Sequence, residues 1–155
     1  MSLPLVHIYC DGACSPNPGL GGWGSILIAP ERKGYRKELQ GSEADSTNNR
    51  MELTAALVAL KALKTPCRVQ VFTDSKYVCN AFAEKWLDTW QGNGWRTSGK
   101  KAVSNADLWR ELLEAVRVHQ VTWHWVRGHS DDVENNRADA LAVAARLELA
   151  ARLGR

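Results

Sequence analysis

The sequence has no apolar run that approaches the ~20 residues of a membrane-spanning helix. Residues 1–4 also lack the charged and apolar regions that are typical of a signal peptide. These two absences argue against a helical membrane protein and against an exported one. They predict a cytoplasmic protein that has no membrane partner.

Cysteine is scarce, and its spacing excludes two common kinds of site. The chain contains 4 cysteines in 155 residues, and no two of them form a Cys-x-x-Cys pair. A zinc ribbon or a dithiol redox motif is therefore not expected. In a protein without an export signal, we expect the thiols to be reduced and partly buried.

Neither sign of charge dominates the composition. The chain has 20 Lys and Arg residues against 17 Asp and Glu residues, which gives a formal net charge of +3. This balance permits a nucleic-acid partner but does not establish one. A chain of this length can bury a core of its own, so we expect a single domain over residues 1–155, acting as a monomer.

The periodicity of the apolar residues predicts an α/β protein. Alternation is typical of strands, which are expected at 5–9, 23–28, 34–39, 68–73 and 121–126. Spacings of three and four residues predict helices at 49–64, 75–85, 105–117 and 132–153, with a short helical turn around 86–90. The first three strands are close in sequence and should be antiparallel, whereas helices separate the first, fourth and fifth strands, which should be parallel. The result is a five-stranded mixed sheet flanked by helices.

Four acidic residues from distant segments are expected at one edge of this sheet. Asp11 and Asp74 close the first and fourth strands. Glu52 lies one turn into the first helix, and Asp139 lies one to two turns into the last. Open α/β sheets bind ligands at the carboxyl edge of their strands. Clustered carboxylates favour Mg²⁺ or Mn²⁺, and two such ions about 4 Å apart can promote hydrolysis of a phosphodiester.

Each acid also has a purely structural alternative. Asp11 can belong to a turn, and Glu52 can complete a capping box that begins at Asn49. Asp74 can cap the next helix, and Asp139 can be a solvated helix position. The functional interpretation therefore depends on the joint placement of the four side chains.

Polar side chains beside these acids are further candidates. His129 lies in the loop after the last strand, where it can shuttle a proton or help to release a product, although most loop histidines are inert. Asn17 and the run Thr47-Asn48-Asn49 can bind ribose hydroxyls and base edges in a shallow minor groove. The alternative for these residues is turn and cap chemistry.

Tryptophans and cations are interleaved between residues 85 and 101. The segment contains Trp86, Trp90 and Trp95, together with Lys85, Arg96, Lys100 and Lys101. Such a stretch can follow a sugar-phosphate backbone. The alternative is a small hydrophobic cluster beside the main core.

Five segments in order resemble type 1 ribonuclease H, the bacterial ribonuclease HI. They are Asp11–Gly19, Thr47–Leu53, Thr73–Val78, Trp125–His129 and Asn135–Asp139. The resemblance implies the RNase H fold, without a separate hybrid-binding domain. It also implies an endonuclease that cleaves the RNA strand of RNA–DNA hybrids and leaves 5′-phosphate and 3′-hydroxyl ends.

The resemblance implies roles for individual residues. The positions that match the family's metal-binding acids are Asp11, Glu52, Asp74 and Asp139, for two Mg²⁺ ions with Mn²⁺ as the alternative. His129 matches the family's mobile catalytic histidine. The positions that match substrate contacts are Cys14, Asn17, Asn48 and Asn49 at the minor groove, Thr47 and Asn105 at a DNA-strand phosphate, and Trp86 and Trp90 on a basic protrusion.

The chain departs from the family's pattern in three places. Lys76 stands where a glutamine often contacts the RNA strand, and its ammonium can hold a phosphate instead. Residues 91–93 are Gln-Gly-Asn in a stretch that is often rich in Lys and Arg, which predicts weaker or less salt-dependent binding. Asp131 and Asp132 add negative charge after His129. Two alternatives to the ribonuclease are a hybrid-binding module without catalysis and a DNA nuclease of the same fold.

Overall fold

The strands form a five-stranded sheet in the computed structural model, which describes residues 3–127 and 132–155. The strand order is β3-β2-β1-β4-β5. Their bounds are β1 (Leu5–Cys14), β2 (Gly19–Ala29), β3 (Tyr35–Ser46), β4 (Arg68–Thr73) and β5 (Gln120–Trp125). The first three strands pair antiparallel, and β1, β4 and β5 are parallel. The predicted mixed sheet is confirmed.

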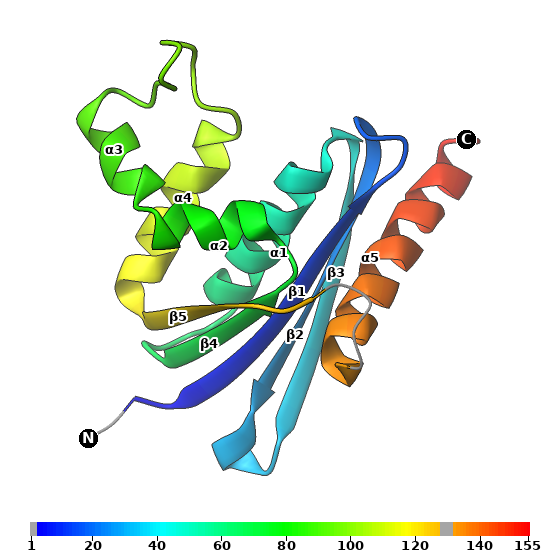
Figure 1. Ribbon diagram of the computed structural model, residues 1–155. Coiled ribbons are helices and arrows are strands. Elements are labelled where there is room, and N and C mark those ends of the chain that lie inside the picture. Colours follow the sequence, from blue (N-terminus) through cyan, green and yellow to red (C-terminus); the bar gives the residue numbers. More distant parts are fainter. Residues whose placement is uncertain (1–2, 128–131) are drawn as a thin grey trace.

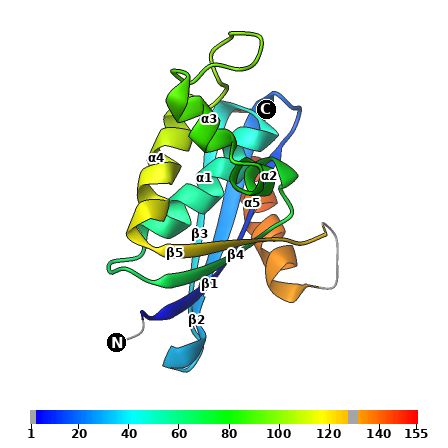
Figure 2. The same cartoon turned by 60° about the vertical axis from the view of Figure 1, so that its left-hand side comes forward.

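The helices cover the two faces of this sheet unequally. They are α1 (Asn48–Lys61), α2 (Lys76–Ala83), α3 (Trp86–Gly92), α4 (Ala106–Val118) and α5 (Val133–Arg152), with a short 3-10 turn at Pro30–Arg32. Figure 1 shows α1 to α4 on one side of the sheet and α5 alone on the other. In the turned view of Figure 2, α3 and the loop that follows it project from the body of the protein. Within the described parts of the chain, no helix combines the length and the apolarity that crossing a bilayer requires.

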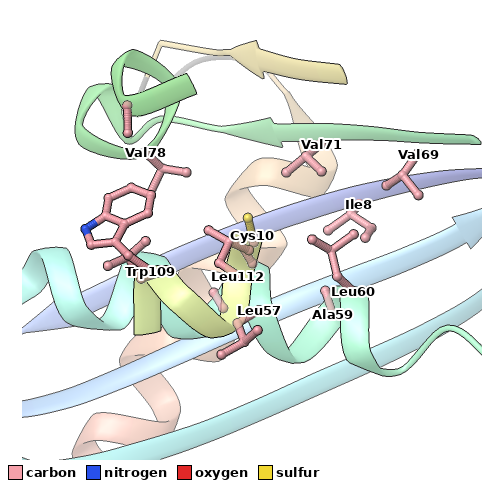
Figure 3. Close-up of a cluster of buried hydrophobic side chains, with 14 of the residues drawn as sticks. Ile8, Cys10, Leu57, Ala59, Leu60, Val69, Val71, Val78, Trp109 and Leu112 are labelled. Carbon is pink, nitrogen blue, oxygen red and sulfur yellow. The ribbon is translucent and has the colours of Figure 1, made fainter. Parts of the chain in front are cut away.

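The main hydrophobic core lies between the sheet and the helices on the α1 side (Figure 3). Ile8 and Val71 face it from the strands, and Leu60 faces it from α1. The Trp109 indole of α4 is fully buried, and its Nε1 donates a hydrogen bond to the Tyr77 hydroxyl at 2.9 Å. Burial of these side chains supplies the main stabilisation of the fold.

The last helix packs closely against the backbone of β2, beside a small apolar cluster of Ala138, Leu141 and Ile26. A Cβ atom at Gly22 of β2 would lie 2.1 Å from the Ala142 carbonyl oxygen of α5, and one at Gly24 would lie 2.6 Å from that of Ala138. Only glycine allows this approach. At the start of α5, Arg137 binds both carboxylate oxygens of Glu38 in β3 at 2.9 Å, so the helix is also held by charge at the sheet edge.

Several predicted boundaries are wrong. The first strand does not end at Asp11, because β1 continues pairing with β2 as far as Cys14 opposite Gly21. The second strand begins at Gly19, and the third continues through polar residues to Ser46, because backbone pairing does not require apolar side chains. The first helix ends at Lys61 rather than at residue 64. The helical turn that carries Trp86 and Trp90 is a helix, α3, so three helices separate β4 from β5 rather than two.

Candidate active site

Three carboxylates from separate elements meet at one edge of the sheet. Asp11 comes from β1, Glu52 from α1, and Asp74 directly follows β4. One oxygen of each lies within 4.8 Å of the others. Asp11 and Glu52 are only 4% and 6% exposed, whereas Asp74 is half-buried. This group can hold a metal ion.

Gly12 explains why Glu52 reaches Asp11. A Cβ atom at Gly12 would lie 2.6 Å from the backbone nitrogen of Glu52, so the first turn of α1 rests directly on the backbone of β1. The Gly12 N–H also donates to Asp11 Oδ1 at 2.9 Å. The helix is capped by Thr47, whose Oγ1 accepts from the Arg50 N–H at 3.1 Å. The capping box from Asn49 is therefore wrong, and the Glu52 carboxylate points to the acidic cluster.

Asp74 is positioned by its neighbours and is not a helix cap. Ser75 caps α2, because its hydroxyl accepts from the Val78 N–H at 3.2 Å. The Trp125 indole at the end of β5 donates to the Asp74 carbonyl oxygen at 3.0 Å, and the Lys76 ammonium lies 4.9 Å from the centre of the Trp125 ring. Trp125 therefore holds the backbone of Asp74 and makes a cation–π contact with Lys76, a predicted substrate contact.

Asp139 completes one wall of the same cleft. The cleft has a volume of about 300 Å³ and is lined by Asp11, Glu52, Asp74 and Asp139 together with Gly12 to Ser15 and parts of α1 and α5. Asp139 is half-buried, and its charge is among the causes of the raised pKa of Asp11. The structure thus brings together the four acids that the sequence predicted.

The electrostatics of the cluster fit a divalent cation. Burial raises the pKa of Asp11 to about 8, with further contributions from the negative charge of Asp74 and the hydrogen bond with Asp139. Burial, followed by the charges of Asp11 and Asp74, also raises the pKa of Glu52 well above its usual value. Within the described residues, Glu52 Oε2 is buried without a hydrogen-bond partner. A buried oxygen without a donor, among carboxylates that repel one another, is what a hard cation would satisfy.

The raised pKa of Asp11 gives the metal-free protein an unusual pH dependence. The folded state keeps the Asp11 proton between about pH 4 and pH 8, whereas the unfolded state loses it near pH 3.8, so stability falls as the pH rises through this window. We expect Asp11→Asn to be more stable than the parent protein at pH 8 by up to about 6 kcal/mol, since the pKa rises from 3.8 to about 8 and one pKa unit is about 1.4 kcal/mol. The difference should shrink towards pH 4.

Urea denaturation in EDTA, at several pH values across this range, measures the effect. Equal free energies of unfolding at pH 8 would contradict the proposed burial of the Asp11 charge. Addition of Mg²⁺ should stabilise the parent protein more than the variant.

The predicted minor-groove residues lie together beside the acids. The Cys14 N–H donates to Asn48 Oδ1 at 2.9 Å, and the Asn48 N–H donates to Asn17 Oδ1 at 3.1 Å. These bonds fix the turn after β1 against the start of α1. Asn49 is exposed next to Asn48 at the same end of the helix.

Arg50 joins the two residues that the resemblance assigns to a phosphate. Its backbone N–H binds Thr47, and its Nη1 lies 3.4 Å from Asn105 Oδ1. The same guanidinium binds Asp107 at 3.0 Å and Glu43 at 2.8 Å, which ties the starts of α1 and α4 to β3. Sequence reasoning assigned no role to this arginine, because Asn105 and Asp107 lie far away along the chain.

The tryptophans of the protrusion contact one another. The ring centres of Trp86 and Trp90 lie 6.0 Å apart, and Trp90 lies 6.1 Å from Trp95 and 5.8 Å from Trp109 of α4. Trp86, Trp90 and Trp95 are half-buried and pack against the main core. Much of the surface of these three indoles is thus buried against other side chains of the protein. The predictions for His129 and Asp131 fall outside the described residues.

Sequence reasoning missed one row of residues on α5. Asn135, Val143 and Arg146 line the cleft on the same helix face as Asp139. Asp139, Val143 and Arg146 follow Asn135 by four, eight and eleven residues, which places all four on one face of a helix. Once Asp139 had been chosen, this spacing could have identified the other three. Asn135 is 2% exposed, and its Oδ1 has no partner among the described residues.

The chain combines a mixed sheet with a cluster of carboxylates at the carboxyl edge of its parallel strands. This combination is typical of α/β enzymes that hold a metal ion in an acidic cleft. The model of the RNase H family matches residues 4–146. The chain therefore belongs to the RNase H family.

Relatives and solved structures agree with this membership. The chain is 58% identical over 140 residues to the Ribonuclease H of Symbiobacterium thermophilum, covering 90% of this chain and 93% of that protein. It is 57% identical over 140 residues to the Ribonuclease H of Moorella thermoacetica, covering 90% of each. The crystal structure of LC9-RNase H1, a type 1 RNase H with the type 2 active-site motif, has a TM-score of 0.84 and 35% identity, covering 96% of this chain and 74% of that one.

Proposed function

We propose that this protein is an endonuclease that cleaves the RNA strand of RNA–DNA hybrids and leaves 5′-phosphate and 3′-hydroxyl ends. The observation that carries the proposal is the group of three carboxylates within 4.8 Å in a chain of the RNase H family. The two relatives described above carry the name Ribonuclease H. A further structure with the same fold, at 20% identity and a TM-score of 0.72, is LC11-RNase H1 in complex with an RNA/DNA hybrid.

Asp11, Glu52 and Asp74, together with Asp139, are the residues that would hold Mg²⁺, with two ions proposed and Mn²⁺ as the alternative. When bound, the ions would supply an activated water and stabilise charge on the leaving oxygen of the phosphodiester. The chain's own contribution is to keep the carboxylates close and shielded from water, so that binding of cations displaces the protons held by Asp11 and Glu52. His129 is proposed to move a proton at the edge of this cleft.

Substrate recognition is proposed to extend from the acids in two directions. Cys14, Asn17, Asn48 and Asn49 would bind ribose hydroxyls and base edges across the minor groove, where a 2′-hydroxyl distinguishes RNA from DNA. Thr47 and Asn105, held by Arg50, would bind a DNA-strand phosphate. Lys76 and the protrusion with Trp86 and Trp90 would contact the nucleic-acid backbone. We propose that the whole chain acts as one monomeric, cytoplasmic domain.

Cleavage of three matched duplexes tests the proposal. In Mg²⁺, the RNA–DNA hybrid should be cut at least about 100-fold faster than DNA–DNA, because a site built to bind a specific hydroxyl rejects ligands that lack it. RNA–RNA should also be cut more slowly than the hybrid, because its second strand lacks the B-like shape of a DNA strand. EDTA should abolish cutting. Equal cutting of DNA–DNA would overturn the ribonuclease assignment, and binding of the hybrid without metal-dependent cleavage would favour the non-catalytic binding module.

A further inference from the structure

Arg146 occupies an isolated position in the acidic cleft. Among the described residues that line the cleft, it is the only cation, facing four carboxylates. No hydrogen bond or ion pair joins its guanidinium to a described residue. An arginine that lines a polar cleft, half-buried and without a partner among the described residues, offers its donors to a ligand.

The base of this side chain is fixed by the fold. A Cβ atom at Gly22 would lie 2.7 Å from the Arg146 nitrogen and 3.1 Å from its Cβ, so this turn of α5 is pressed onto β2. The same turn lies near the end of β1, because Arg146 and Cys14 line the same cleft. The pKa of that thiol is raised by burial, and lowered in part by a hydrogen bond from the Gly19 backbone and by Arg146. Arg146 thus lies at the Cys14 end of the cleft, on the same helix stripe as Asp139.

The distance along the helix places Arg146 beyond the acids. Seven residues separate it from Asp139, which corresponds to about 10 Å along the helix axis. Arg146 and the four acids line one continuous cleft, so a nucleic-acid strand with one phosphate at the acids would pass Arg146 as well. The fork of a guanidinium matches the oxygens of a phosphate, whereas the neighbouring carboxylates repel them.

We propose that Arg146 binds a backbone phosphate of the strand that is cut, adjacent to the phosphate held at the acids. This inference rests on the proposed function, because it assumes that a nucleic-acid strand fills the cleft. Arg146 then offsets the repulsion between the acidic cleft and the substrate and holds the strand in line with the cleavage site. It is a positioning residue for the substrate and does not touch the reacting atoms.

Arg146→Gln tests the proposal, with Arg152→Gln as the matched control. Arg152 lies on the same helix, is exposed and does not line the cleft, so the control removes the same charge from the same element. For Arg146→Gln, KM for an RNA–DNA hybrid should rise about tenfold, the size expected for one charge-assisted hydrogen bond, while kcat changes much less. Arg146→Lys should recover part of the loss, because it keeps the charge without the planar fork.

The salt dependence of binding separates a phosphate contact from a structural role. Between about 50 and 200 mM KCl, the slope of log Kd against log[KCl] should decrease by about 0.7–0.9 for Arg146→Gln and stay unchanged for Arg152→Gln. Binding is measured by fluorescence anisotropy with Ca²⁺ in place of Mg²⁺, and thermal melts of each variant check the fold.

Each outcome tests one claim. If the parent protein cleaves the hybrid, and Arg146→Gln matches Arg152→Gln in KM and in salt slope, the inference about Arg146 is overturned and the ribonuclease assignment stands. If Arg146→Gln binds with the reduced slope but the parent protein does not cleave, the phosphate contact stands and the proposed activity fails. If Arg146→Gln is unstable, Arg146→Lys decides instead. A raised KM with an unchanged salt slope supports the phosphate contact, and a KM equal to that of the parent protein overturns the role of the guanidinium.

Discussion

Asp74→Asn is expected to retain the fold and to cleave the RNA–DNA hybrid about 10³-fold more slowly in Mg²⁺. This is the upper end of the loss in rate that follows removal of one preorganised electrostatic contact to a transition state. The amide keeps the size of the side chain but removes the charge that the acidic cluster offers to a cation. Stability should not fall, because one charge that raises the pKa of both Asp11 and Glu52 is also removed. The Trp125 hydrogen bond goes to the Asp74 backbone and is unaffected.

Initial cleavage rates and urea denaturation of the same preparations measure the two halves of this prediction. Glu148→Gln provides the matched control, because Glu148 is an exposed acid of α5 that does not line the cleft. Substantial Mg²⁺-dependent activity in Asp74→Asn would remove Asp74 from the proposed metal site. Loss of activity together with loss of structure would show instead that the side chain supports the fold.

Among substitutions of the described glycines by alanine, Gly22→Ala is expected to be the most destabilising. The new Cβ would lie 2.1 Å from the Ala142 carbonyl oxygen, and neither backbone can move without displacing α5 from β2. Overpacking of this kind costs about 3 kcal/mol or more where backbone is the obstacle. Since α5 carries Asp139, cleavage activity should fall along with stability.

Gly92→Ala is the control for this substitution. A Cβ atom there meets nothing within 4 Å, and the residue is the last of helix α3. We expect its stability to be unchanged or raised by about 0.4–1 kcal/mol, through the lower entropy of the unfolded chain. Equal free energies of unfolding for the two variants in urea would contradict the close contact between α5 and β2.

The sequence predicted the bounds of a strand correctly where alternating side chains and flanking turn residues indicate the same limits. β4 was predicted with its observed bounds, because Val69 and Val71 alternate between Pro66 and the polar residues after Thr73. The ends of β1 and β3 could not be found in this way. Gly12 carries no side chain to show its pairing, and the second half of β3 is polar because it lies at an edge.

The candidate site shows the same division. The four acids lie on elements that the predicted topology brings to one sheet edge, so topology predicted that they would meet. Asp11 lies in β1, Asp74 directly follows β4, Glu52 lies near the start of α1 and Asp139 lies in the second turn of α5. Arg50, Trp125 and Arg146 have no such marker, because their roles arise from contacts between elements that are distant in sequence. Gly12 is a further example: the motif contained it, but only the structure shows that its missing side chain lets α1 bring Glu52 to Asp11.

The position of α5 has a consequence for how the protein is made. Chains are synthesised from the N-terminus, and β1 to β5 with α1 to α4 precede Val133. The face of the sheet that packs on α1 can therefore assemble while the other face, with Gly22 and Gly24, is still bare. One wall of the cleft, with Asp139 and Arg146, is added only when α5 leaves the ribosome and docks. We therefore expect nuclease activity to begin only after α5 has been synthesised and has docked.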